Sequence, residues 1–183
     1  MKCMDKYIQK ITEALDKVES PYFKLETTYE PTGIVRERAF CYELYHQLRL
    51  ALKGDSGLTL NGEIDKRGHD DFAKEHRKNP DFVFHIPGQH KGNTIVMEMK
   101  GRVDKPDGII KDFHTITTFV DKYQYQLGIF LLYNHSFGEL SDALSNFKDV
   151  GSLPAIDKTL IITKQAHGIP VEVITPNQKT TLR

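Results

Sequence analysis

Residues 127–133 read Leu-Gly-Ile-Phe-Leu-Leu-Tyr, a continuous apolar run. A strand with one face in solvent alternates apolar and polar side chains, whereas a strand covered on both faces is apolar along its whole length. The run therefore predicts a fully buried strand. A sheet that contains such a strand needs helices on both faces, and this requirement constrains the fold more than any other feature of the chain.

Periodic apolar patterns predict the helices and strands around that run. Helices are expected where apolar residues recur at steps of three and four, which happens at 4–18, 35–52, 108–121 and 137–147. Strands are expected at short apolar or alternating segments bounded by turn residues, which are 58–64, 81–86, 94–101, 160–163 and 171–174. The polar segment 66–79 is expected to be a loop.

These elements predict an α/β fold with a central mixed β-sheet flanked by helices. Residues 1–33 are expected to form an amphipathic helix and a linker, because Ser20-Pro21 and Pro31-Thr32-Gly33 are turn signals. Residues 34–183 are expected to form the main domain. A chain of 183 residues is long enough to bury one sizeable core.

Composition excludes several classes of protein. Hydrophobic residues make up 39% and charged residues 27%, which is typical of a globular domain, and no apolar run approaches a membrane span. We expect no membrane partner and a cytoplasmic location, because the N-terminus lacks an apolar signal core. The 25 basic and 25 acidic side chains cancel, so any basic surface for nucleic acid must be local.

The segment Met97-Glu98-Met99-Lys100 carries the most informative polar pattern. Successive side chains of a strand point to opposite faces, so Glu98 and Lys100 share one face. Asp81 begins the preceding strand, and a hairpin between the two strands would bring it within reach of Glu98. Two carboxylates beside a lysine can hold a hard divalent cation through oxygen ligands.

This trio suits the hydrolysis of a phosphodiester. A Mg²⁺ ion on Asp81 and Glu98 would neutralise charge on the phosphate and lower the pKa of a bound water. Lys100 would orient that water or stabilise the phosphate charge. The backbone carbonyl of Met99 is a candidate for a further ligand.

Helical phase adds Glu37 to the candidates. At about 100° per residue, Glu37 lies within roughly 40° of Cys41, Leu44 and Leu48, on the apolar face of its helix. A bare carboxylate there is costly unless it points into a polar site. Glu63, on the polar side of the first strand, and His85, on the same strand face as Asp81, are additional candidates. An ordinary sheet histidine is an equally good interpretation of His85.

The pattern Pro80-Asp81, a hairpin, then Glu98-Met99-Lys100 resembles the PD-(D/E)xK nuclease superfamily. The order helix, three strands, helix, strand over about 100 residues is also similar to the restriction-endonuclease-like core of that superfamily, here with an added N-terminal helix and C-terminal strands. The resemblance implies that Asp81 and Glu98 are metal ligands and that Lys100 is the catalytic lysine. Arg36-Glu37-Arg38 resembles the acidic motif on the first core helix of the family, and Glu63 resembles an acidic first-strand position of some branches.

The resemblance implies a Mg²⁺-dependent endonuclease or exonuclease, with Mn²⁺ able to substitute, and DNA as the expected substrate. Arg102, Lys105 and Lys111 follow the Glu98–Lys100 strand and are candidates for contacts to the nucleic-acid backbone, or else ordinary exposed charges. A homodimer or a partner protein would supply specificity. The alternatives are a catalytically silent nuclease-fold module that binds nucleic acid or protein, an enzyme acting on RNA or branched junctions, and an unrelated sheet protein.

Overall fold

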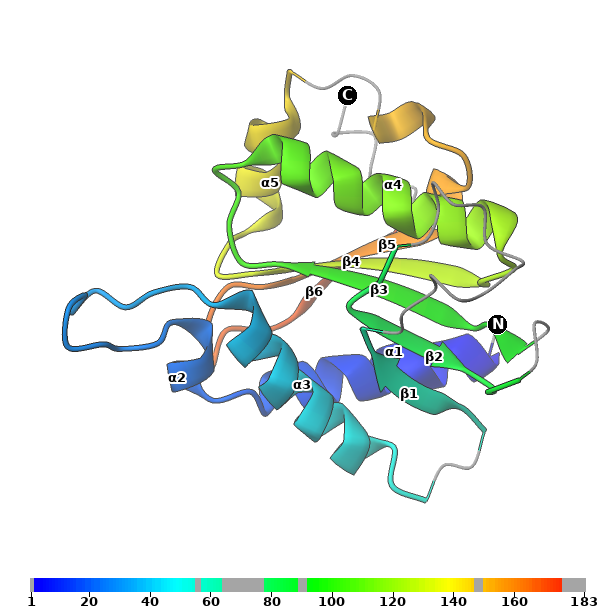
Figure 1. Cartoon of the computed structure of the whole chain (residues 1–183), viewed down its shortest axis with the longest axis horizontal. Helices are drawn as coiled ribbons and strands as arrows, with labels where there is room; N and C mark the ends of the chain where they lie inside the picture. Colours follow the sequence, from blue (N-terminus) through cyan, green and yellow to red (C-terminus); the bar gives the residue numbers. More distant parts are fainter. Residues whose placement is uncertain (1, 55–56, 64–77, 89–91, 147–149, 176–183) are drawn as a thin grey trace.

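The computed structural model describes residues 2–54, 57–63, 78–88, 92–146 and 150–175, and in these a six-stranded sheet lies between two layers of helices (Figure 1). The helices are α1 (Lys2–Asp16), α2 (Ser20–Phe23), α3 (Glu37–Ala51), α4 (Pro106–Lys122) and α5 (Phe137–Leu144). The strands are β1 (Thr59–Gly62), β2 (Phe82–His85), β3 (Ile95–Lys100), β4 (Leu127–Tyr133), β5 (Thr159–Lys164) and β6 (Glu172–Ile174).

The strands lie in the sheet in the order in which they occur in the chain, from β1 to β6. The central pairs β3–β4 and β4–β5 are parallel, and the pairs toward both edges are antiparallel. Parallel neighbours need a crossover, and crossovers are right-handed. The two crossovers, which contain α4 and α5, run in the same direction across the sheet, so both helices cover one face, and α1 and α3 cover the other (Figure 1).

The face under α1 and α3 is a continuous apolar layer. Ile11 and Leu15 of α1 are fully buried, as are Phe40, Leu44 and Leu48 of α3. They pack against alternate residues of the strands in one core. The apolar stripe predicted for residues 4–18 therefore serves the domain core.

The opposite face is covered by α4 and α5. Proline is the first residue of α4, where its missing N–H has no intrahelical partner to lose. Ile109, Phe113, Ile116 and Val120, which define the predicted apolar stripe, are all buried against the sheet. A capping box at Ser136 begins α5.

The predicted α/β fold with a mixed sheet and flanking helices is confirmed. The strand 127–133 is β4, central in the sheet, and its residues 128–133 are buried. Helix α2 lies within the segment predicted to be linker, because Ser20-Pro21 begins a short helical turn. Most of the loop predicted at 66–79 lies outside the described residues. No helix of the described part of the chain is long and apolar enough to cross a membrane.

Candidate active site

The candidate site is built where β3 extends beyond β2. The antiparallel pairing of β2 with β3 covers Ile95, Val96 and Met97, whereas the last three residues of β3 pair only with β4. The edge of β3 is therefore open at residues 98–100. Asp81, just before β2, partly fills this position, because its Oδ2 accepts the Met99 N–H at 2.8 Å.

Asp81 and Glu98 are brought together at this edge, as the hairpin predicts. The register pairs Phe82 with Met97, so the next pair outward is Asp81 with Glu98. Glu98 is 8% exposed. The two carboxyl groups lie close enough to perturb each other's pKa, and their negative charges would repel each other if both were ionised without a cation.

Burial dominates the electrostatics of this pair. It raises the pKa of Asp81 to about 6, although the hydrogen bond from the Met99 N–H partly opposes the rise. Burial also raises the pKa of Glu98 well above its ordinary value, and the negative charges of Asp81 and Asp112 raise it further. Two adjacent carboxyl groups, one buried and one half-buried, that resist ionisation together are a place where a cation would be strongly stabilised.

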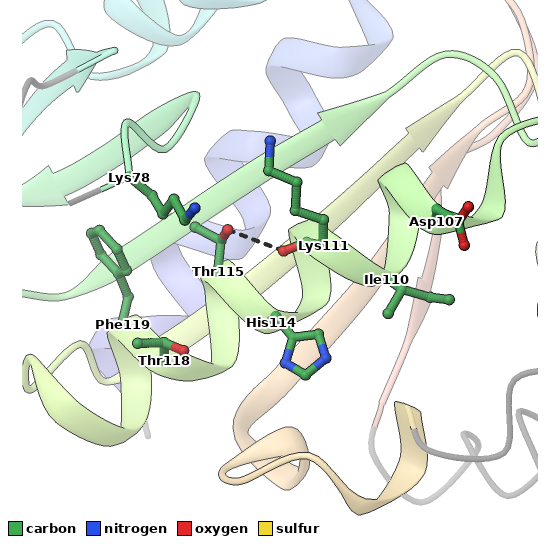
Figure 2. A pocket seen from close by; sticks show the side chains of 8 residues that line it. All are labelled: Lys78, Asp107, Ile110, Lys111, His114, Thr115, Thr118 and Phe119. Carbon is green, nitrogen blue, oxygen red and sulfur yellow. Dashed lines mark hydrogen bonds between the residues drawn. The ribbon is translucent and has the colours of Figure 1, made fainter. Parts of the chain in front are cut away.

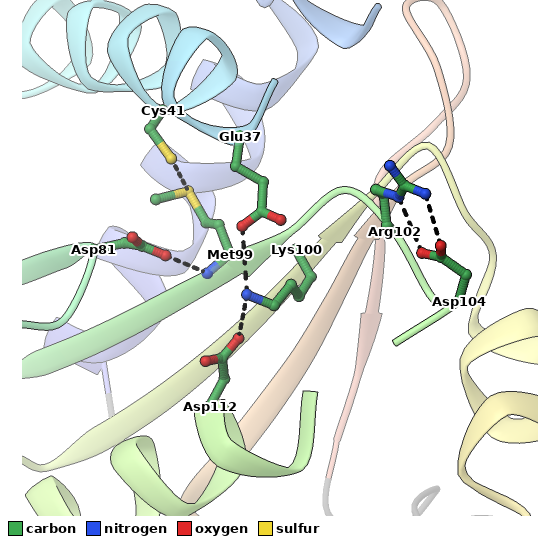
Figure 3. Close-up of polar contacts among 8 residues, drawn as sticks. All are labelled: Glu37, Cys41, Asp81, Met99, Lys100, Arg102, Asp104 and Asp112. Atoms are coloured by element: carbon green, nitrogen blue, oxygen red, sulfur yellow. Dashed lines mark hydrogen bonds and ion pairs between the residues drawn. The ribbon is translucent and has the colours of Figure 1, made fainter. Parts of the chain in front are cut away.

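The Lys100 side chain lies between helices from opposite faces of the sheet (Figure 3). Its Nζ is 2.9 Å from Asp112 Oδ2 on α4 and 3.4 Å from Glu37 Oε2 on α3. Glu37 is the first residue of α3, and the stack of Phe40 on Tyr133, with ring centroids 3.8 Å apart, fixes that end of the helix against β4. Lys100 and Asp112 side chains are 23% and 11% exposed, so this ion pair is largely removed from water.

The charges around Lys100 keep it protonated. Burial alone would lower the pKa of the ammonium, but the contact with Asp112 and the charge of Glu37 outweigh burial, and its pKa is raised. Burial raises the pKa of Asp112, and the contact with Lys100 partly opposes that rise. The ammonium is therefore a fixed positive charge beside the Asp81–Glu98 pair.

The residues present suit a Mg²⁺ ion. Backbone N–H and C=O groups of one strand residue point to the same edge, so the Met99 carbonyl faces the open edge together with its N–H. Two carboxylates and a carbonyl match the few protein ligands that Mg²⁺ takes while keeping several waters. Among the described residues, no group of three or more His, Cys, Asp or Glu side chains is already gathered around a cation position.

Glu63 lies near Asp81 without joining the pair. Its N–H donates to the Asp81 carbonyl at 3.1 Å, while its carboxylate pairs with Arg38 at 3.3 Å. Both Glu63 and Asp81 line a cavity of about 410 Å³ beside Cys41. Burial and then the charges of the surrounding acidic groups raise the pKa of the Cys41 thiol, so it stays protonated.

Four further candidates are not brought to the carboxylate pair. His85 lies at the far end of β2, where its Nε2 is 2.9 Å from Asn61 Oδ1. Arg102 is exposed and bound by Asp104 at 2.7 Å. Lys105 precedes α4 as its N-cap, and Lys111 lies on the exposed side of α4, next to Asp112 in the chain.

Sequence reasoning missed Asp112. The signal that selected Glu37 was also present here, since Asp112 lies within about 60° of Ile109 on the helical wheel, at the border of the apolar face of α4. A carboxylate in that position is costly without a partner, and Lys100 is the partner. Helical phase applied to every helix would have found it.

Comparisons with protein-family models, with curated proteins and with solved structures found no match to this chain. The case for its function therefore depends on the geometry of the site.

Proposed function

We propose that this protein is a Mg²⁺-dependent nuclease that hydrolyses phosphodiester bonds, with DNA as the expected substrate, and that its sheet is a restriction-endonuclease-like core. One observation carries the proposal: a pair of carboxyl groups, the half-buried Asp81 and the buried Glu98, lies at an open strand edge, beside a lysine held by two further carboxylates. The chain order from α3 to β4 agrees with the core of that fold.

In this proposal Asp81, Glu98 and the Met99 carbonyl hold the cation, and Mn²⁺ can replace Mg²⁺. When bound, the cation supplies charge neutralisation at the phosphate and a water of lowered pKa. The positive charge of the bound cation would offset the cost of ionising Asp81 and Glu98 together. Asp81 has a second role, because its contact with the Met99 N–H holds the strand edge in place.

Lys100 acts as the fixed cationic donor of the site. Its ammonium would donate a hydrogen bond to the attacking water or to a phosphoryl oxygen, where negative charge develops in the transition state. Asp112 and Glu37 are positioning residues, since each fixes the ammonium from a different face of the sheet. A lysine held in this way loses little conformational freedom when the substrate binds.

A cleavage assay tests the proposal. The purified protein is incubated with linear duplex, single-stranded and branched DNA and with RNA, in Mg²⁺, Mn²⁺ or EDTA. We expect cleavage that requires the cation and that falls about 10²-fold or more in Lys100→Ala, while Lys53→Ala, which removes an exposed lysine after α3, keeps full activity.

Two results would contradict this function. Equal cleavage by Lys100→Ala and the unmodified protein would mean that a contaminant or another site cuts the substrate. Binding of nucleic acid without any metal-dependent product would favour the alternative of a silent nuclease-fold module.

A further inference from the structure

A groove of about 410 Å³ runs along the outer side of α4 (Figure 2). Eight of the described residues line the groove, and seven of these belong to α4 and recur at steps of three and four, so they form one stripe of the helix. The eighth is Lys78, which comes from the segment leading to Asp81. The groove is thus bounded by two segments that also reach the candidate active site.

The groove is lined by side chains that suit a phosphate backbone. Lys78, Lys111 and His114 are exposed, and Thr118 adds a hydroxyl group, whereas the hydroxyl of the buried Thr115 donates to the Lys111 carbonyl. Among the described residues that line the groove, Asp107, at the first turn of α4, is the one acidic residue. These described residues bring two lysines against one aspartate, so their net charge is positive even when His114 is neutral, although the whole chain has a formal net charge of zero.

The two lysines differ from Arg102 and Lys100, whose charges are paired. Arg102 is bound by Asp104, and Lys100 is held by Asp112 and Glu37. Within the described part of the chain no ion pair engages Lys78 or Lys111, so their charge is not neutralised there. A phosphate is the partner that two such ammonium groups, close to a phosphodiesterase centre, would recognise.

The groove is also connected to the candidate site through the chain. Lys111 is next to Asp112, which contacts Lys100, and Lys78 is three residues before Asp81. From Lys111 to Thr118 the helix rises about 10 Å, which equals the rise of about three base pairs along the axis of duplex DNA. A strand whose phosphate lies at Asp81 and Glu98 would have its next few phosphates within reach of this stripe.

We propose that the groove along α4 is a phosphate-binding track, in which Lys78 and Lys111, assisted by His114, hold the substrate strand on one side of the scissile bond. The proposal rests on the nuclease function proposed above and names the surface through which the substrate is gripped. These contacts are to phosphate oxygens and carry no base preference, so the track contributes affinity without sequence selectivity.

Salt dependence of binding measures phosphate contacts directly. A fluorescein-labelled oligonucleotide, duplex or single-stranded, is titrated with the full chain in EDTA at several salt concentrations. The logarithm of the binding constant falls linearly with the logarithm of the salt concentration. Each lost phosphate contact makes this fall less steep, by about 0.9 for duplex and about 0.7 for a single strand. We expect the double variant Lys78→Ala/Lys111→Ala to reduce the steepness of this fall by about 1.8 for duplex and by about 1.4 for a single strand.

The matched control is Lys17→Ala/Lys53→Ala, which removes two exposed lysines that follow α1 and α3, on the opposite face of the sheet. This control changes the net charge by the same amount as Lys78→Ala/Lys111→Ala. Its salt dependence of binding should equal that of the unmodified protein within error. Circular dichroism and melting temperature verify that both variants fold.

The possible failures are distinguishable. Metal-dependent cleavage together with an unchanged slope in Lys78→Ala/Lys111→Ala would overturn the track and leave the nuclease function standing. No binding and no cleavage by the unmodified protein would overturn both. Tighter binding of an oligoglutamate than of the oligonucleotide, lost in the same variant, would assign the groove to an acidic protein partner and overturn the proposal.

Discussion

Replacing Asp81 with asparagine should stabilise the cation-free protein and, on the proposed function, abolish cleavage of the substrate. Asparagine has nearly the same shape, and its amide oxygen can still accept the Met99 N–H that Asp81 accepts at 2.8 Å. What the substitution removes is a half-buried negative charge beside Glu98. If the proposed function is correct, the substitution also removes a ligand of the cation.

The magnitude follows from the pKa of Asp81, which burial raises from 3.8 to about 6. The folded protein binds this proton more tightly than the unfolded chain, so ionisation of Asp81 destabilises the fold. The penalty is absent below about pH 3.8, grows between about pH 3.8 and pH 6, and is constant above. At about 1.4 kcal/mol for each pH unit, it amounts to about 3 kcal/mol at pH 8.

Urea unfolding in EDTA at pH 4.5 and pH 8 measures this penalty. The unmodified protein should lose free energy of unfolding as the pH rises, and Glu98, whose pKa is raised in the same direction, adds to the loss. Asp81→Asn should be more stable than the unmodified protein by up to about 3 kcal/mol at pH 8, and by much less at pH 4.5. Asp142→Asn, which removes an exposed carboxylate on α5, should show no such difference.

Added Mg²⁺ gives the second half of the test. It should stabilise the unmodified protein at pH 8, because a ligand that binds only the folded state raises the free energy of unfolding. Asp81→Asn should respond little. A lower stability of Asp81→Asn than of the unmodified protein at pH 8 would contradict the burial penalty. An equal increase in the free energy of unfolding of both proteins on addition of Mg²⁺ would contradict the role of Asp81 in holding the cation.

Three further predictions concern the surroundings of the site. Asp112→Asn replaces one anionic partner of Lys100 by a neutral amide and keeps Glu37, so on the proposed function kcat should fall by about 10²-fold with KM nearly unchanged; an unchanged kcat in steady-state assays would show that Asp112 does not position the lysine. Gly101→Ala places a Cβ 2.6 Å from Val35 Cγ1 and against the Tyr133 ring, and should cost about 1–3 kcal/mol or more in thermal unfolding. Gly151→Ala, whose Cβ meets nothing within 4 Å, should be nearly neutral, and equal losses in both would contradict the steric account. In a Cys3→Ser background, Cys41 should react slowly with a thiol reagent at pH 8 and rapidly in urea, since burial raises the pKa of its thiol; rapid reaction of the folded protein would contradict this.

Much of the fold could be predicted because periodicity reports burial. Residues 127–133 were expected to be buried on both faces, and β4 is central in the sheet with both faces covered. The prediction of an apolar stripe on α4 is also confirmed, because the residues of the stripe are buried. Boundaries were less accurate: α4 begins at Pro106, two residues before the expected start, because proline fits the first position of a helix.

The candidate site was predictable where local periodicity determines direction. Alternation along β3 places Glu98 and Lys100 on one face, and helical phase directed Glu37 inward. His85 shares a strand face with Asp81 by the same alternation, but four residues of strand span about 13 Å, which separates it from the pair. Alternation gives the face of a side chain and not its distance from the site.

The sequence alone determined which residues are apolar, which faces they occupy and which strand carries the carboxylate and lysine, because these depend on spacing along the chain. Only the tertiary structure decided that β2 ends before β3 does, which opens the strand edge at residues 98–100. It also decided that Lys100 meets Asp112 and Glu37 from opposite layers, and that Lys78 lies beside α4. Such contacts join segments far apart in the chain, and they depend on how helices pack on the sheet, which no local pattern encodes.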